Sequence, residues 1–113
     1  MIPDWMTGFA AAITVGDAEG IIVYMNEKSI KTFEKYGGRD LIGRSLFDVH
    51  PEPARTKLAH LYRTRASHSY TIEKNGVKKL IHQAPWYRED QFMGFVELSI
   101  ELPGEMSHYI RES

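Results

Sequence analysis

The chain of 113 residues contains no cysteine. This absence excludes disulfides, thiolate metal sites, cysteine nucleophiles and any chromophore attached through a cysteine. It agrees with the reducing conditions of the cytoplasm, which is the location we expect. A long hydrophobic run is also missing. The N-terminus carries an acid at Asp4 and only a short apolar stretch, so we predict neither a signal peptide nor a membrane span.

A large excess of charge of either sign is missing too. Lys and Arg number 14 and Asp and Glu number 15, which gives a formal net charge of −1 at pH 7. We therefore expect no general attraction to nucleic acid or to an anionic membrane. The 42% content of hydrophobic residues is typical of a globular domain, and the length suits a single one.

Signatures of catalysis are absent as well. The sequence has no Ser-His-acid pattern and no glycine-rich phosphate loop, since Gly37 and Gly38 are better explained as a helix stop. Asp17 and Glu19 fall in a tight turn, whose chemistry accounts for them without a metal ion. We expect a protein that is not an enzyme and holds no metal.

The elements that are present follow a simple order. Two short strands are predicted at residues 12–16 and 21–25, joined by the turn 17–20, and Asn26 is placed to cap the helix that follows. A longer helix is predicted over residues 52–66, and strands near 69–74, 77–87 and 92–102 come after it. Two strands, a run of helices and three strands indicate an α+β domain with helices on one face of an antiparallel sheet. Residues 11–102 form this domain, with a short helical cap over residues 1–10 and a tail over 103–113.

Four stretches, in this order, resemble PAS domains: "DAEGIIVYMN" (17–26), "LIGRSLFDVHPE" (41–52), "NGVKK" (75–79) and "APWYREDQFMGFVELSIEL" (84–102). The resemblance implies a five-stranded antiparallel sheet whose flanking helices enclose a small-molecule pocket. It also implies a domain that senses a ligand, redox state or light, or that pairs with other PAS domains. PAS domains wired to an effector often end in a signal junction that Ser99–Gly104 does not match, so we expect output through a signalling partner in trans.

The resemblance leaves three functions open. The first is a sensor that binds a small ligand between the helix at 52–66 and the sheet. The second is a scaffold whose pocket is filled by side chains and whose activity is pairing. The third is a binder of haem or of non-covalent flavin. Covalent flavin photochemistry is excluded, because Gly43-Arg44-Ser45-Leu46 lacks the Asn-Cys pair of the light-sensing flavin group.

Histidines are the candidates for holding a ligand. Helical geometry places His60 about 145° from the apolar stripe that contains Leu58 and Leu61, so we expect it to face solvent. His50 precedes the helix, where it could cap backbone donors or contact a ligand. His82 lies in a strand with apolar groups on both faces, and periodicity does not decide which face is buried. We take the candidate pocket as Phe33, Phe47, His50, Leu58, Tyr62, His82, Trp86 and Phe95.

The leading helix carries three apolar side chains, Trp5, Met6 and Phe9. A helix this short cannot bury its apolar side alone, so it should dock on its own sheet or on a second copy of the chain. Leading helices of PAS domains often make the contact between two copies, and we therefore predict a homodimer through these residues.

Overall fold

An antiparallel sheet of five strands forms the centre of the structure, a computed structural model that describes residues 2–112. The spatial order is β2-β1-β5-β4-β3, so the first and last strands of the sequence are neighbours. The predicted α+β class and sheet are confirmed. The strands are β1 (Ala12–Asp17), β2 (Ile22–Met25), β3 (His68–Lys74), β4 (Val77–Arg88) and β5 (Gln91–Leu102).

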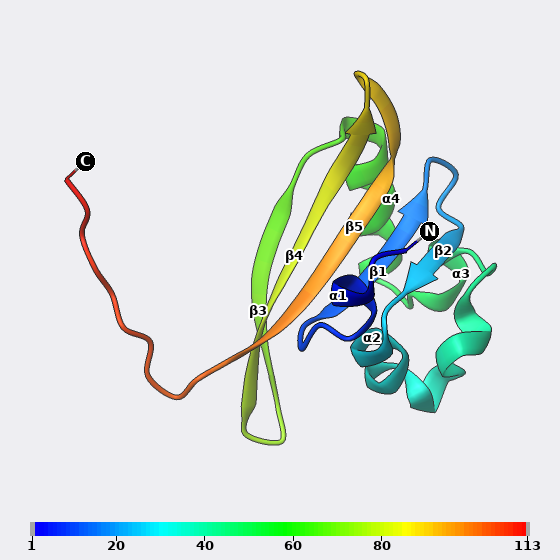
Figure 1. Cartoon of the computed structure of the whole chain (residues 1–113). Helices are drawn as coiled ribbons and strands as arrows, with labels where there is room; N and C mark the ends of the chain where they lie inside the picture. Colours follow the sequence, from blue (N-terminus) through cyan, green and yellow to red (C-terminus); the bar gives the residue numbers. More distant parts are fainter. Residues whose placement is uncertain (1, 113) are drawn as a thin grey trace.

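The helices fall between β2 and β3, apart from the short leading helix. They are α1 (Asp4–Thr7), α2 (Glu27–Thr32), the 3-10 turns η1 (Glu34–Tyr36) and η2 (Gly38–Leu41), α3 (Leu46–Val49) and α4 (Ala54–Thr64). Figure 1 shows α2, α3 and α4 along one side of the sheet, while the chain after β5 extends away from it. No helix in the described part of the chain is long and apolar enough to cross a membrane.

The predicted long helix is shorter than residues 52–66. It begins at Ala54, where Glu52 accepts hydrogen bonds from the backbone N–H and the hydroxyl of Thr56 and thus takes the capping role. These bonds hold the pKa of Glu52 below its ordinary value. The helix ends at Thr64, because Arg65 adopts the left-handed conformation with φ of 58°.

Asn26 joins three parts of the fold. It is 1% exposed, and its Oδ1 accepts from the backbone N–H of Ser29 at 3.0 Å, which confirms the predicted cap. Oδ1 also accepts from Ile13, and Nδ2 donates to the carbonyls of Met6 and Ala11. A buried amide with all its hydrogen bonds made ties α2 and the leading segment to β1.

Two glycines permit close approaches that a side chain would block. Gly20 closes the β1–β2 turn with φ of 86°, and a Cβ there would overlap the Phe47 ring. Gly94 on β5 has φ of 136°, and its Cβ would meet the carbonyl oxygen of Gly16 on β1. The turn itself is held by Asp17, whose carboxylate accepts from two backbone N–H groups, as its turn role predicts.

The polarity of the two faces of the sheet is the reverse of the usual arrangement. Gln83 of β4 and Glu97 of β5 point toward the helices. Since side chains alternate along a strand, Leu80, Leu98 and Ile100 occupy the opposite, outer face. The helix-facing side of the central strands is therefore polar in places, and the outer side is apolar.

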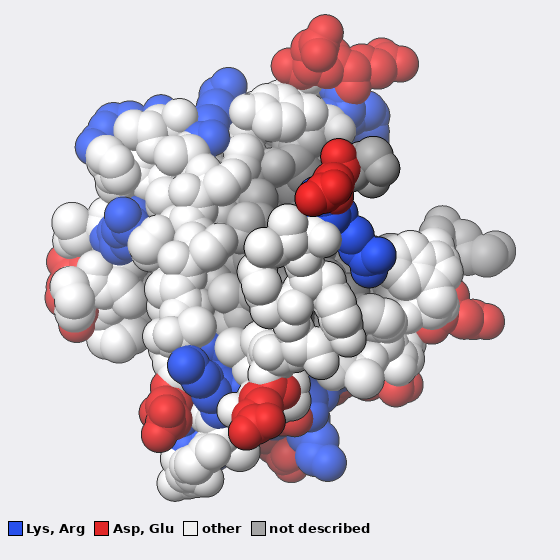
Figure 2. Space-filling view, turned by 90° about the vertical axis from the view of Figure 1, so that its left-hand side faces the viewer, with Lys and Arg blue, Asp and Glu red and all other residues white. Residues whose placement is uncertain are grey.

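Charged side chains of both signs are mixed on the surface. Figure 2 shows Lys and Arg interspersed with Asp and Glu around uncharged residues on the side that lies left in Figure 1. This mixture agrees with the net charge of −1 and gives that side no field of a single sign.

Candidate functional site

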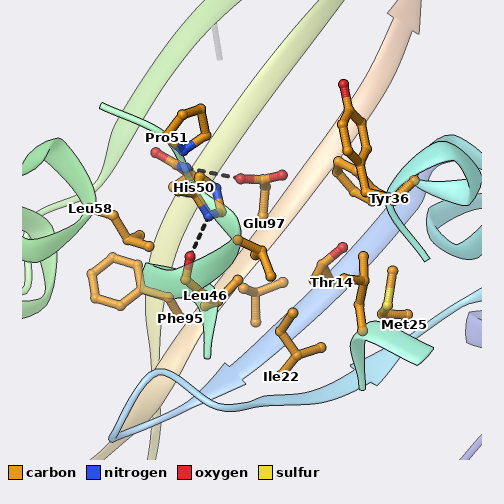
Figure 3. A pocket seen from close by; sticks show the side chains of 15 residues that line it. Thr14, Ile22, Met25, Tyr36, Leu46, His50, Pro51, Leu58, Phe95 and Glu97 are labelled. Carbon is orange, nitrogen blue, oxygen red and sulfur yellow. Dashed lines mark hydrogen bonds between the residues drawn. The ribbon is translucent and has the colours of Figure 1, made fainter. Parts of the chain in front are cut away.

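A cavity of about 270 Å³ lies between the sheet and the helical segment (Figure 3). Its walls come from the first two strands, the segment from α2 to α4, and the middle of β4 and β5. Most of the lining is apolar, with a few polar residues among it; Figure 3 shows His50 and Glu97 together, and Thr14 and Tyr36 apart from them. The lining residues are Thr14, Ile22, Met25, Phe33, Tyr36, Leu41, Leu46, Val49, His50, Pro51, Leu58, Gln83, Phe95, Val96 and Glu97.

Four residues of the predicted pocket line this cavity: Phe33, His50, Leu58 and Phe95. They come from four separate parts of the chain, the end of α2, the end of α3, the middle of α4 and the start of β5. The PAS resemblance thus placed the cavity on the correct side of the sheet, between α4 and the strands.

Phe47 and Tyr62 lie beside the cavity rather than in its wall. Tyr62 packs with ring centroids 5.3 Å from Phe47 and 4.7 Å from Phe95, and Phe92 completes the aromatic cluster. The Tyr62 hydroxyl donates to the backbone carbonyl of Asp17 at 3.0 Å. Burial, with a contribution from the Asp17 charge, raises the pKa of Tyr62 to about 12. These aromatic rings fill space, which corrects their assignment to the pocket.

His82 and Trp86 are on the other face of the sheet, and their assignment to the pocket is also corrected. Ile81 and Gln83 face the helical side, so the alternation of β4 turns His82 outward. There His82 Nδ1 lies 2.6 Å from the hydroxyl of Ser69 on the neighbouring strand. The choice between the two faces was open in the sequence because both carry apolar residues.

The other histidines divide as follows. His60 is exposed on α4 and pairs with Arg63, as helical geometry predicts. His50 does not cap α4. Its Nδ1 lies 2.6 Å from the backbone oxygen of Leu46, and because a carbonyl only accepts, Nδ1 carries the proton. Nε2, which accepts a hydrogen bond when the ring is neutral, has no partner in the described residues.

The polar residues Gln83 and Glu97 line the cavity but were not singled out from the sequence. They face each other in register across β4 and β5, and the Gln83 amide donates to Glu97 Oε2 at 2.9 Å. Neither Gln83 Oε1 nor Glu97 Oε1 has a hydrogen-bond partner within residues 2–112. We call Gln83, Glu97 and His50 the acceptor set. A glutamate in the middle of a long β-prone run was the signal available in the sequence.

A second hollow of about 200 Å³ adjoins the cavity and shares Phe33, His50 and Glu97 with it. Tyr70 and Lys79 also line this hollow. The pKa of Tyr70 is raised, first by burial and then by the negative charge of Glu97. The Glu97 carboxylate therefore borders both the cavity and the second hollow, and its charge affects Tyr70 in the second one.

Comparison with known families identifies the fold. The family model described as "PAS fold" matches residues 7–86. The chain belongs to the PAS family. PAS domains are typical of sensory and signal-transduction modules. A search among curated proteins finds no match.

Solved PAS structures superpose on most of this domain. The PAS domain of a protein from Colwellia psychrerythraea is 20% identical, with 88% of this chain and 92% of that chain covered and a TM-score of 0.60. The PAS domain of nitrogen regulation protein NR(II) from Vibrio parahaemolyticus is 15% identical, with coverages of 88% and 95% and a TM-score of 0.56. The Aer2 receptor from Vibrio cholerae, described as a dual PAS-heme oxygen sensor, is 16% identical, with coverages of 82% and 95% and a TM-score of 0.59.

The 270 Å³ of the cavity lies just below the range of about 300–1,000 Å³ that pockets for drug-sized ligands span, and His50 borders it. No cluster of three or more metal-ligating side chains occurs in the part of the chain that the structure describes.

Proposed function

We propose that this PAS domain is a sensor that binds a small molecule in the 270 Å³ cavity and passes the signal to a partner protein in trans. The observation that carries the proposal is the cavity itself, with walls that are mainly apolar and a few polar groups among them. Apolar concave sites with a small number of placed polar groups are the usual form of small-molecule sites. The proposed role is sensing and not catalysis.

The relay rests on which segments form the cavity walls. Leu46, Val49, His50 and Pro51 contribute side chains from α3 and the link into α4, and Leu58 contributes from α4 itself. A bound molecule therefore adds contacts to residues 46–58 as a group. Ordering this segment is the change that a partner could detect.

Toluene is a suitable neutral probe for the cavity, because a dry cavity of about 150 Å³ accepts benzene. At a concentration near its Kd, toluene should raise the Tm by about 2 °C. Val49→Trp should fill the space and abolish this rise, whereas Val77→Trp, at an exposed strand end, should retain it. A wild-type protein whose Tm is unchanged at saturating toluene contradicts the proposal.

The relay has a separate test in amide hydrogen exchange. Toluene should slow exchange in residues 46–58 by several-fold and leave the β3–β4 hairpin around Asn75 unchanged. Slowing that is equal throughout the chain would reflect global stabilisation alone and would contradict a local relay.

Pairing of two copies is supported by a different observation. Trp5 and Phe9 of the leading segment are 66% and 54% exposed, and the outer face of the sheet carries the apolar side chains of Leu80, Leu98 and Ile100. Met6 is partly buried, because its carbonyl is held by Asn26. We propose that a second copy covers the leading segment and this face.

Light scattering tests the pairing. The wild type should show twice the chain mass of 13.0 kDa, and Trp5→Ala combined with Phe9→Ala should show the single mass. Tyr109→Ala is the matched control, because this aromatic side chain is equally exposed, at 70%, in the tail. A double variant that keeps the wild-type mass removes the leading segment from the interface.

A further inference from the structure

The acceptor set presents hydrogen-bond acceptors to the cavity and its surroundings. The Gln83 amide donates one N–H to Glu97 Oε2. Gln83 Oε1 and Glu97 Oε1 remain as acceptors without a partner in the described residues. His50 adds Nε2, because its Nδ1 proton is used by the Leu46 carbonyl. Thr14, the other central polar group, is already paired with Ser29 at 2.6 Å. The acceptors without a partner in the described residues, Gln83 Oε1, Glu97 Oε1 and His50 Nε2, outnumber the remaining donors, which are the second N–H of Gln83 and the Tyr36 hydroxyl.

Glu97 also forms no salt bridge within residues 2–112. The salt bridge within the described chain joins Lys28 to Glu101. Glu101 lies on the same face of β5 as Glu97, but beyond Ser99 along the strand. Lys79 lines the adjoining hollow, but it is in register with Glu101 and forms no salt bridge with Glu97 among residues 2–112. A half-buried carboxylate beside apolar walls is costly without a positive partner.

We propose that the natural ligand is a small apolar cation that carries N–H groups, with the class of aromatic amidines and amines as the type. The charged group binds the Glu97 carboxylate and donates to His50 or Gln83, and the apolar body lies against Ile22, Met25 and Phe95. This rests on the proposed function, since it names the ligand class for the same cavity. Hydrogen bonds between charged partners are about twice as strong as neutral ones, so the charge selects the ligand.

Four probes built on the same benzene ring test the ligand class separately from the cavity. Benzamidine is the cation, benzamide its neutral isostere, benzoate the anion and toluene the neutral body alone. Binding of each is measured by isothermal titration calorimetry at pH 7 to the wild type, to Glu97→Gln and to Glu101→Gln. Glu101 is the matched control, because it lies on the same strand and face but pairs with Lys28 at the surface.

Benzamidine should bind the wild type at least tenfold more tightly than benzamide, and benzoate should bind most weakly. Glu97→Gln should erase the tenfold preference while keeping toluene, which shows that its cavity is intact. Glu101→Gln should keep the preference. Equal binding of benzamidine and benzamide to the wild type, or a preference that survives Glu97→Gln, overturns the cation proposal while toluene binding leaves the cavity standing. Failure of all four probes, toluene included, overturns the proposed function as well.

Discussion

The space beneath the helices of this PAS domain has two ends that differ in what fills them. At one end Phe47, Tyr62, Phe92 and Phe95 pack ring against ring, and the Arg65 guanidinium lies 4.3 Å from the centre of the Phe92 ring. At the other end the rings give way to a hollow of about 270 Å³ bordered by the acceptor set. One sheet face thus carries a closed core and an open site side by side. We expect substitutions at the closed end to change mainly the free energy of unfolding, and substitutions at the open end to change mainly ligand affinity.

Among substitutions at the closed end, we expect the largest loss of stability at Gly94. A Cβ there overlaps the Gly16 carbonyl of the neighbouring strand, and φ of 136° is unfavourable for other residues. Gly94→Ala should lower the free energy of unfolding by about 3 kcal/mol or more. Gly76→Ala, at φ of 79° with open space around it, should cost only about 1 kcal/mol. Urea unfolding followed by circular dichroism measures both, and equal losses would refute the close approach of β1 and β5.

Truncation should cost more at the closed end than at the open end. Tyr62→Ala removes a ring from the aromatic cluster and should lower the free energy of unfolding by about 3 kcal/mol. Met25→Ala should cost only about 2 kcal/mol, because one side of Met25 already borders empty space. Chemical denaturation of the two variants gives the comparison. A larger loss for Met25→Ala would show that the hollow is closed in solution.

The closed end also predicts a dependence on alkaline pH. The pKa of Tyr62 is raised from 10.0 to about 12, so the folded state keeps its proton where the unfolded state releases it. The contribution of protonated Tyr62 to the free energy of unfolding is complete below pH 10 and is lost as the pH rises from 10 through about 12. Tyr62→Phe should be less stable at pH 8 by about 1 kcal/mol and should lose less stability between pH 10 and 12 than the wild type. Tyr109→Phe, in the exposed tail, should follow the wild-type profile.

The smallest predicted effect is a gain at the open end. Val49→Ile adds one methylene that can occupy the hollow, and should stabilise the protein by up to about 0.8 kcal/mol while weakening toluene binding. Val77→Ile, at an exposed position, should change neither quantity measurably. Thermal unfolding with and without toluene checks both. A loss of stability in Val49→Ile would indicate that this wall is already filled.

Local signals in the sequence predicted most of the fold. Asn26 marked the start of α2, Asp17 and Gly20 marked the first turn, and the period of α4 placed His60 in solvent. These features depend on neighbouring residues, so a single sequence contains them. The order of elements, together with the PAS resemblance, then gave the sheet and the side on which a pocket would lie.

The membership of the pocket was predicted only in part, for a physical reason. Hydrophobic alternation normally identifies the buried face of a strand, but β5 carries Leu98 and Ile100 outward and Glu97 toward the cavity. Gln83 and Glu97 of the acceptor set place polar groups on the face that covers the cavity, which is the reverse of the usual pattern. The same alternation places His82 on the outer face, away from the cavity. Phe47 and Tyr62 were placed in the pocket because periodicity cannot tell an aromatic that lines a space from one that fills it.

The most direct test of the open end is a two-dimensional ¹H–¹⁵N NMR titration of the labelled wild type with toluene. Binding in the cavity should shift the amide signals of Leu46, Val49, Phe95 and Glu97 together, with one Kd, and leave those of the Asn75-Gly76 turn in place. Shifts confined to the exposed leading segment or the outer sheet face, or no saturable shift at all, would contradict a ligand-binding cavity.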